Sequence, residues 1–225
     1  MMKIGHRGAA DLEPENTLLG IKRAIELGMD AVEVDVRKTK DNHLVVIHDE
    51  KVDRTTDGKG YVCEMTLEQI QKLKSGKGER IPTIQQVIDA VKGKCKLIIE
   101  LKEHTTEIAV AEIIKKNKLE EECYVISFHH PIIRMIKSYC PELHTGLLFV
   151  GEPVEPVKVA EEANSEALFP NYKFLTNQMT SKLHNAGMKI FVWNCDTKED
   201  IECMKKAGVD GISSNRPDLL AEVLG

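Results

Sequence analysis

Short apolar runs alternate with amphipathic helical patterns along the whole chain. The apolar runs have the length of buried parallel strands and lie at residues 3–6, 31–36, 96–101, 123–127, 144–149, 167–170, 189–193 and 209–213. Helical patterns occupy residues 17–27, 83–91, 105–117, 131–139, 156–164, 176–186 and 197–207. Eight strand–helix units in 225 residues predict an α/β fold, a (β/α)8 TIM barrel. An open doubly wound sheet is the alternative, but no glycine-rich phosphate loop follows the first strand.

One strand-like segment, residues 44–48, does not fit the alternation. It begins only eight residues after Val36, which is too short for a parallel crossover, so we expect a hairpin with Asp41-Asn42 as a two-residue turn. This register places Asp35 opposite His48 and brings His48 to the mouth of the barrel, whereas a slip by one residue would turn His48 to the other face.

Residues 51–81, which follow the hairpin, lack the barrel periodicity and contain four glycines and one short helical pattern. We expect a small insertion after the second barrel strand, within a single domain that spans residues 1–225.

Composition narrows the classes of function. The net charge of −5 disfavours nucleic acid as a partner, and no apolar run approaches the length of a membrane-spanning helix. Six scattered cysteines form no C-x-x-C pair, and the chain opens without an apolar leader, so we expect a cytoplasmic protein with reduced cysteines. The sequence does not predict the oligomeric state, because no exposed apolar stripe stands out.

Acidic residues stand at the ends of two predicted barrel strands. Glu33 and Asp35 share one face of the second strand, and Glu100 and Lys102 share one face of the third. Buried carboxylates are costly unless a positive charge lies between them. Three of them, from Glu33, Asp35 and Glu100, form an all-oxygen set that suits one divalent cation, Mg²⁺ or Ca²⁺. The alternative is that they are solvated or paired with Lys102.

Two histidines and an arginine are expected at the same face of the barrel. His6 and Arg7 end the first strand, and the hairpin brings His48 beside them. A divalent cation and a guanidinium neutralise a phosphoryl oxygen, while one histidine accepts a proton and the other donates one. This combination suits phosphodiester cleavage. Trp193, at the end of the seventh strand, is expected either to stack on a substrate carbon skeleton or to pack at the rim.

These residues resemble the glycerophosphodiester phosphodiesterase family. The resemblance runs over nearly the whole chain and rests mainly on five segments, which are specific together: His6-Arg7-Gly8, Glu15-Asn16-Thr17, Glu33-Val34-Asp35-Val36, His48-Asp49 and Glu100-Leu101-Lys102. Ser127-Phe128, Val192-Trp193-Asn194, Asp210-Gly211-Ile212 and Asn215-Arg216-Pro217 also look like family positions.

The resemblance implies metal-dependent hydrolysis of glycerophosphodiesters to glycerol 3-phosphate and an alcohol. It implies that His6 and His48 are the general acid/base pair and that Glu33, Asp35 and Glu100 bind the metal. It also implies that Arg7 and Lys102 contact phosphate and that Asn16 supports the first loop. Either water or the glycerol 2-hydroxyl can be the nucleophile, and the sequence does not say which histidine is the acid.

Two other functions use the same scaffold. A lysophospholipase D-like enzyme would need an apolar channel, for which the candidate wall residues are Phe128, Leu147, Phe149 and Trp193. A catalytically silent, metal-holding binding module is disfavoured, because a binder has no need for two proton-transfer groups.

Overall fold

The computed structural model describes residues 1–225 and contains a closed barrel of eight parallel strands, which confirms the predicted TIM barrel. The ring closes because β1 pairs in parallel with both β2 and β9. A ninth strand, β3, pairs antiparallel with β2 outside the ring. The strands are β1 Met2–Gly5, β2 Ala31–Lys38, β3 Leu44–Val46, β4 Lys96–Leu101, β5 Cys123–Ser127, β6 His144–Phe149, β7 Ala167–Pro170, β8 Lys189–Val192 and β9 Gly211–Ser214.

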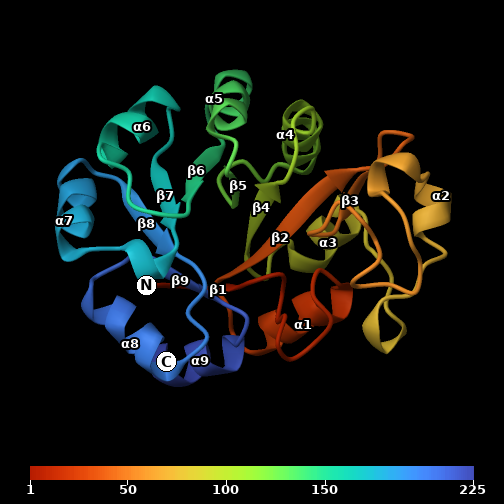
Figure 1. Cartoon of the computed structure of the whole chain (residues 1–225), viewed down its shortest axis with the longest axis horizontal. Coiled ribbons are helices and arrows are strands. Elements are labelled where there is room, and N and C mark those ends of the chain that lie inside the picture. The colour runs from red at the N-terminus through yellow and green to blue at the C-terminus, as the bar shows by residue number, and fades with distance from the viewer.

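Helices follow the barrel strands and surround the ring (Figure 1). They are α1 Leu18–Glu26, α3 Ile84–Val91, α4 Glu107–Asn117, α5 His130–Tyr139, α6 Pro156–Glu162, α7 Asn177–Asn185, α8 Lys198–Lys206 and α9 Pro217–Leu224. The sequence patterns did not include α9, which has no side-chain cap before its first turn. None of the helices has the length and apolar character that a membrane crossing requires.

The two faces of most barrel strands belong to different cores. On β2, Val32 and Val34 belong to a large cluster of 43 buried residues that includes the inner faces of the helices. A separate cluster of nine buried residues, including Ile98 and Phe169, belongs to the opposite strand faces. Because strand side chains alternate, Glu33 and Asp35 lie on the face opposite Val32 and Val34. The alternation of side chains along β2 thus points these carboxylates away from the helices.

The hairpin register predicted from the sequence is wrong by one residue. Val36 pairs with Val46, and Asp35 accepts a backbone hydrogen bond from Ile47 rather than facing His48. The connection has three residues between Thr39 and His43, with Asn42 at φ +66°. A three-residue loop that ends in a left-handed residue is a common hairpin connection, and it shifts the pairing.

The insertion, residues 51–81, contains η1 Val62–Glu64, α2 Leu67–Ile70 and η2 Gly76–Gly78. It lies outside the ring, next to β3 (Figure 1, right). Thr66 and Gln69 cap α2 reciprocally. A third small core joins the insertion to the hairpin and consists of Val45, Ile47, Val52, Val62, Ile70 and Ile81. The insertion is therefore packed against the segment that carries His48.

Candidate active site

Two neighbouring barrel strands bring three carboxylates together. β2 and β4 pair in a register that sets Asp35 directly beside Glu100, and Glu33 lies two residues before Asp35. One oxygen from each of the three carboxylates lies within 4.8 Å of the others, and all three residues are buried. The predicted acidic set is therefore assembled in space.

Two cations accompany the carboxylates. Lys102 Nζ donates to Glu100 Oε1 at 2.6 Å and lies 3.1 Å from Asp35 Oδ1. Arg7 lies on the other side of Asp35, with its Nε 3.3 Å from Asp35 Oδ2, and its backbone N–H donates to Glu33 Oε2 at 2.9 Å. Both cations are thus held by the carboxylates at the edge of the cluster.

Asn16 supports Asp35 rather than lining the cavity. Its side-chain Nδ2 donates to Asp35 Oδ2 at 2.7 Å, and its Oδ1 accepts the backbone N–H of Asp35 at 3.2 Å. Asn16 has φ +55°, a left-handed conformation that asparagine tolerates better than most residues. These two bonds fix the side chain of Asp35 against its own strand.

The ionisation of the three carboxylates is unequal. Burial, with the nearby Asp35 charge, raises the pKa of Glu33 well above its usual value and that of Glu100 to about 7. Burial also opposes ionisation of Asp35, but Lys102 and Arg7 outweigh it and lower its pKa to about 2. Glu33 Oε1 is buried and has no hydrogen-bond partner. Crowded carboxylates with an unpartnered oxygen fit a hard divalent cation, which would favour their charged forms.

His6 is held by side chains from the segments that follow the last two strands of the barrel. Its Nδ1 lies 2.6 Å from Asn215 Oδ1, and Asn194 Nδ2 lies 3.1 Å from the same nitrogen. Its Nε2 faces Glu33 Oε2 at 3.8 Å. Burial and the neighbouring Arg7 charge lower the pKa of His6 to about 4, so its imidazole is neutral near pH 7.

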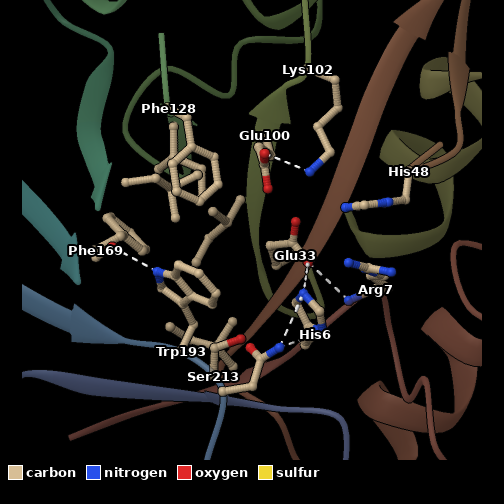
Figure 2. Close-up of a pocket in the computed structure, with 15 residues that line it drawn as sticks. His6, Arg7, Glu33, His48, Glu100, Lys102, Phe128, Phe169, Trp193 and Ser213 are labelled. Atoms are coloured by element: carbon tan, nitrogen blue, oxygen red, sulfur yellow. Dashed lines mark hydrogen bonds and ion pairs between the residues drawn. The ribbon is translucent and has the colours of Figure 1, made fainter. Parts of the chain in front are cut away.

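His48 reaches the same cavity although its register was predicted wrongly. β3 ends at Val46, so His48 lies beyond the paired strand and the alternation of its faces no longer applies. Its Nδ1 lies 2.6 Å from Asp49 Oδ1. Burial lowers the pKa of His48, and the charge of Asp35 opposes this effect. Figure 2 shows His48 across from His6, with Arg7 between them.

One cavity of about 210 Å³ joins these groups to an apolar wall. In Figure 2 the charged residues lie on one side, and Phe128, Phe169 and Trp193 on the other. Trp193 Nε1 donates to the carbonyl of Phe169 at 2.7 Å, and its ring meets that of Phe128 edge-on at 5.7 Å. Fifteen residues line the cavity: Ile4, His6, Arg7, Glu33, His48, Ile98, Glu100, Lys102, Ile126, Phe128, Leu148, Phe169, Trp193, Asn194 and Ser213.

Two residues proposed for an apolar channel are not in this wall. Leu147 and Phe149 belong to the large core that includes the helices. Leu148, between them on β6, lines the cavity instead. The prediction was wrong because strand side chains alternate and the apolar run of β6 does not reveal which face is inner.

Comparison with known proteins decides the family. A model of the glycerophosphoryl diester phosphodiesterase family matches residues 6–219, nearly the entire chain. The chain belongs to this family. It is 42% identical over 234 residues to a glycerophosphodiester phosphodiesterase of Caldanaerobacter subterraneus, which covers 98% of this chain and 96% of that protein. It is 32% identical to a putative glycerophosphodiester phosphodiesterase of Bacillus subtilis, with the same two coverages.

Solved structures of related proteins have the same fold. An Oleispira antarctica phosphodiesterase in complex with the product sn-glycerol-3-phosphate superposes with a TM-score of 0.94 at 25% identity, covering 100% of this chain and 96% of that one. A glycerophosphodiester phosphodiesterase from Thermotoga maritima gives 0.87 at 26% identity, with coverages of 99% and 98%. The protein is therefore a glycerophosphodiester phosphodiesterase by family, an enzyme built on a TIM barrel.

The structure of this phosphodiesterase also adds residues that the sequence interpretation gave no role. Asn194 and Asn215 contact His6, and Asp49 contacts His48. Asn194, Asn215 and Asp49 stand in segments that resemble the family, so the sequence contained a signal for their positions but not for their contacts. Phe169, which lines the cavity, and Arg54, which donates to Asp49 and Glu15, had no such signal.

Proposed function

We propose that this phosphodiesterase hydrolyses glycerophosphodiesters to glycerol 3-phosphate and an alcohol, with one Mg²⁺ or Ca²⁺ held by Glu33, Asp35 and Glu100. The observation that carries the proposal is the cluster of three buried carboxylates within 4.8 Å, in the cavity that two histidines also line. The Oleispira relative, described with sn-glycerol-3-phosphate as its product, supports the choice of product.

The residues beside the carboxylates suit a phosphodiester. When bound, the cation supplies Lewis-acid stabilisation of charge on a phosphoryl oxygen. Arg7 and Lys102 line the same cavity, and their guanidinium and ammonium groups bind the remaining phosphoryl oxygens. Asn16 contributes indirectly, because it holds Asp35 in place.

The two histidines perform the proton transfers. One takes a proton from the nucleophile, which is either water or the glycerol 2-hydroxyl, and the other donates a proton to the leaving alcohol oxygen. In each ring, a side-chain oxygen lies 2.6 Å from Nδ1, from Asn215 for His6 and from Asp49 for His48. A proton on Nδ1 that is donated to this oxygen leaves Nε2 for proton transfer with substrate.

The aromatic wall receives the carbon skeleton of the substrate. Phe128 and Trp193 stand at the side of the cavity opposite the charges. A lysophospholipase D-like preference is the alternative on the same wall, since Ile126, Leu148 and Phe169 extend its apolar surface. Comparing the hydrolysis of glycerophosphocholine with that of its acylated counterpart separates the two, because a strong preference for the acylated ester supports the alternative.

We also propose a cytoplasmic enzyme that acts on small molecules. All six cysteines are free, and Cys123, Cys140 and Cys195 are buried, which suits a reducing compartment. Fractionation of the native cells tests this assignment, and recovery of the enzyme outside the cytoplasm contradicts it.

The test is the release of glycerol 3-phosphate from glycerophosphocholine by chelator-treated enzyme to which Mg²⁺ or Ca²⁺ is returned. His48→Ala removes a proton-transfer group, so kcat should fall by at least about 100-fold. The control is His43→Ala, which removes a histidine from the loop of the same hairpin.

The metal affinity and the melting temperature of His48→Ala should stay close to those of the unchanged enzyme, because His48 is not among the proposed ligands. Unchanged turnover in His48→Ala would refute the acid/base assignment. Full activity after complete chelation would refute the metal dependence.

A further inference from the structure

Arg54 of the insertion connects two branches of the active site. Its Nε and Nη2 donate to the Asp49 carboxylate at 2.7 and 3.0 Å, and its Nη1 and Nη2 donate to the Glu15 carboxylate at 2.7 and 2.8 Å. Asp49 in turn contacts His48 Nδ1 at 2.6 Å, and Glu15 accepts from Arg7 Nη1 at 3.0 Å. One guanidinium thus reaches both a proposed proton-transfer group and a proposed phosphate ligand through one intermediate carboxylate each.

The backbone that carries Arg54 is itself fixed. Val52 is fully buried in the small core of the insertion, and Thr56 N–H donates to the Val52 carbonyl at 3.1 Å, closing a turn around Arg54. Ser75 Oγ donates to the carbonyl of Thr55 at 2.8 Å. Because this backbone is fixed, the guanidinium can hold Glu15 and Asp49 in place. A side chain on a mobile loop could not fix the positions of its partners.

Without Arg54, both carboxylates lose their orientation. The Asp49 side chain is 31% exposed and has a single other partner, His48, so it would be free to rotate. A rotated Asp49 no longer holds the His48 ring with Nε2 toward the cavity. Glu15 would keep only Arg7, and the pair could swing away from Asp35, which lies 3.3 Å from Arg7 Nε.

We propose that Arg54 is a positioning residue, through which the insertion orients His48 for proton transfer and Arg7 for phosphate binding. This inference rests on the proposed function. It gives the insertion an indirect role in turnover. Arg54 is a positioning residue and not a catalytic one, because its side chain does not line the cavity.

The experiment compares Arg54→Ala and Arg54→Lys with Arg80→Ala in the glycerophosphocholine assay. Arg80 belongs to the same insertion and donates to the carbonyl of Gln71, but does not contact Glu15 or Asp49. Loss of a group that orients a metal ligand typically costs about 10–100-fold in metal affinity or activity, and we take the same range for a group that orients a catalytic side chain. We therefore expect kcat/KM of both Arg54 variants to fall by about 10–100-fold, and that of Arg80→Ala to change little.

Added guanidinium gives a readout that a merely structural role would not move. The Arg54 side chain is 48% exposed, so guanidinium from solution can enter the space that Arg54→Ala leaves. It should raise kcat of Arg54→Ala and not that of Arg80→Ala, with sodium chloride at equal ionic strength as control. Arg54→Lys keeps a charge but has one ammonium for four bonds, so it should remain impaired while folded.

The two branches are separated by single changes in the carboxylates. Asp49→Asn should lower mainly kcat, Glu15→Gln should raise mainly KM, and Arg54→Ala combined with Asp49→Asn should have the kcat of Asp49→Asn alone. Wild-type kcat/KM in Arg54→Ala, or a loss that guanidinium does not reverse, overturns the proposal. His48→Ala, measured in parallel, shows separately whether the proposed function itself has failed.

Discussion

Glu33 shows most directly the energetic cost of burying carboxylates in this site. Its carboxylate is buried, one oxygen accepts the backbone N–H of Arg7, and the other oxygen has no partner. Burying a charge without compensation is unfavourable, and the raised pKa of Glu33 expresses that cost. Arg7 and Lys102 offset the charges of Asp35 and Glu100 more directly, because both lie next to Asp35. The unpartnered oxygen of Glu33 is therefore the best single indication that this cluster could hold a cation.

Glu33→Gln tests this reading of the site. The amide oxygen can still accept from Arg7, but the negative charge and one carboxylate ligand are lost. The dissociation constant for Mg²⁺ or Ca²⁺, measured by calorimetry, should rise by at least about tenfold, since ligand charge sets the affinity of such sites. Glu26→Gln on the exposed face of α1 is the control. An unchanged dissociation constant in Glu33→Gln would remove Glu33 from the ligand set.

Among the elements, β6 and β7 shape the cavity together, because a small residue on one strand leaves room for a large side chain on the other. A Cβ added to Gly146 on β6 would lie 2.3 Å from the Phe169 ring of β7, so only glycine leaves room for that ring. The two strands pair through Gly146 and Ala167, two residues before Phe169 on β7. The Phe169 ring lines the cavity. The shape of the aromatic wall thus depends on a missing side chain on the adjacent strand.

Gly146→Ala should lower the free energy of unfolding by about 1–3 kcal/mol, the usual cost of overpacking a core. Urea denaturation measures the change. Phe169→Leu removes the ring edge that the new methyl group meets, so the double variant should be more stable than the sum of the two single changes predicts. Additive effects would show that the Gly146 methyl group is accommodated without displacing Phe169.

Across the whole molecule, we expect the carboxylate cluster to link stability to pH and to the proposed metal. A carboxyl group whose pKa is raised in the folded state binds its proton more tightly there than in the unfolded chain. Its contribution to stability is therefore present at low pH and is lost as pH rises through the unfolded value and then the folded value. For Glu100, whose pKa in the folded protein is about 7, this stabilisation is lost between the ordinary pKa of a glutamate and neutral pH.

The metal-free protein should therefore lose melting temperature, through this group, between about pH 5 and about pH 8, and added Mg²⁺ or Ca²⁺ should restore it most at the higher pH. Differential scanning calorimetry on the unchanged protein and on Glu100→Gln isolates the contribution. The pH slope between the two proteins should differ in this range. Parallel curves, with equal gains from metal at both ends, would exclude Glu100 from the linkage.

The barrel, and the acidic residues that gather at its mouth, could be predicted from the local pattern of the sequence. Parallel strands that are buried on both faces appear in the sequence as short apolar runs, which can be recognised locally. Glu33, Asp35 and Glu100 stand out because they interrupt these runs at the strand ends. Their alternation along β2 and β4 was sufficient to place them on one face, because that alternation is a local property of extended backbone. His6 and Arg7 could be placed at the mouth of the barrel for a different reason, because they directly follow the end of β1.

The contacts among the supporting groups could not be predicted, because they depend on how distant segments pack. The hairpin register depended on one extra loop residue, and the inner face of β6 depended on its neighbours, so both predictions failed there. The contacts of Arg54 with Glu15 and Asp49 cross 39 and five positions of the chain and arise only when the insertion packs on the hairpin. Such contacts follow from the packing of distant segments, which leaves no periodic trace in the sequence.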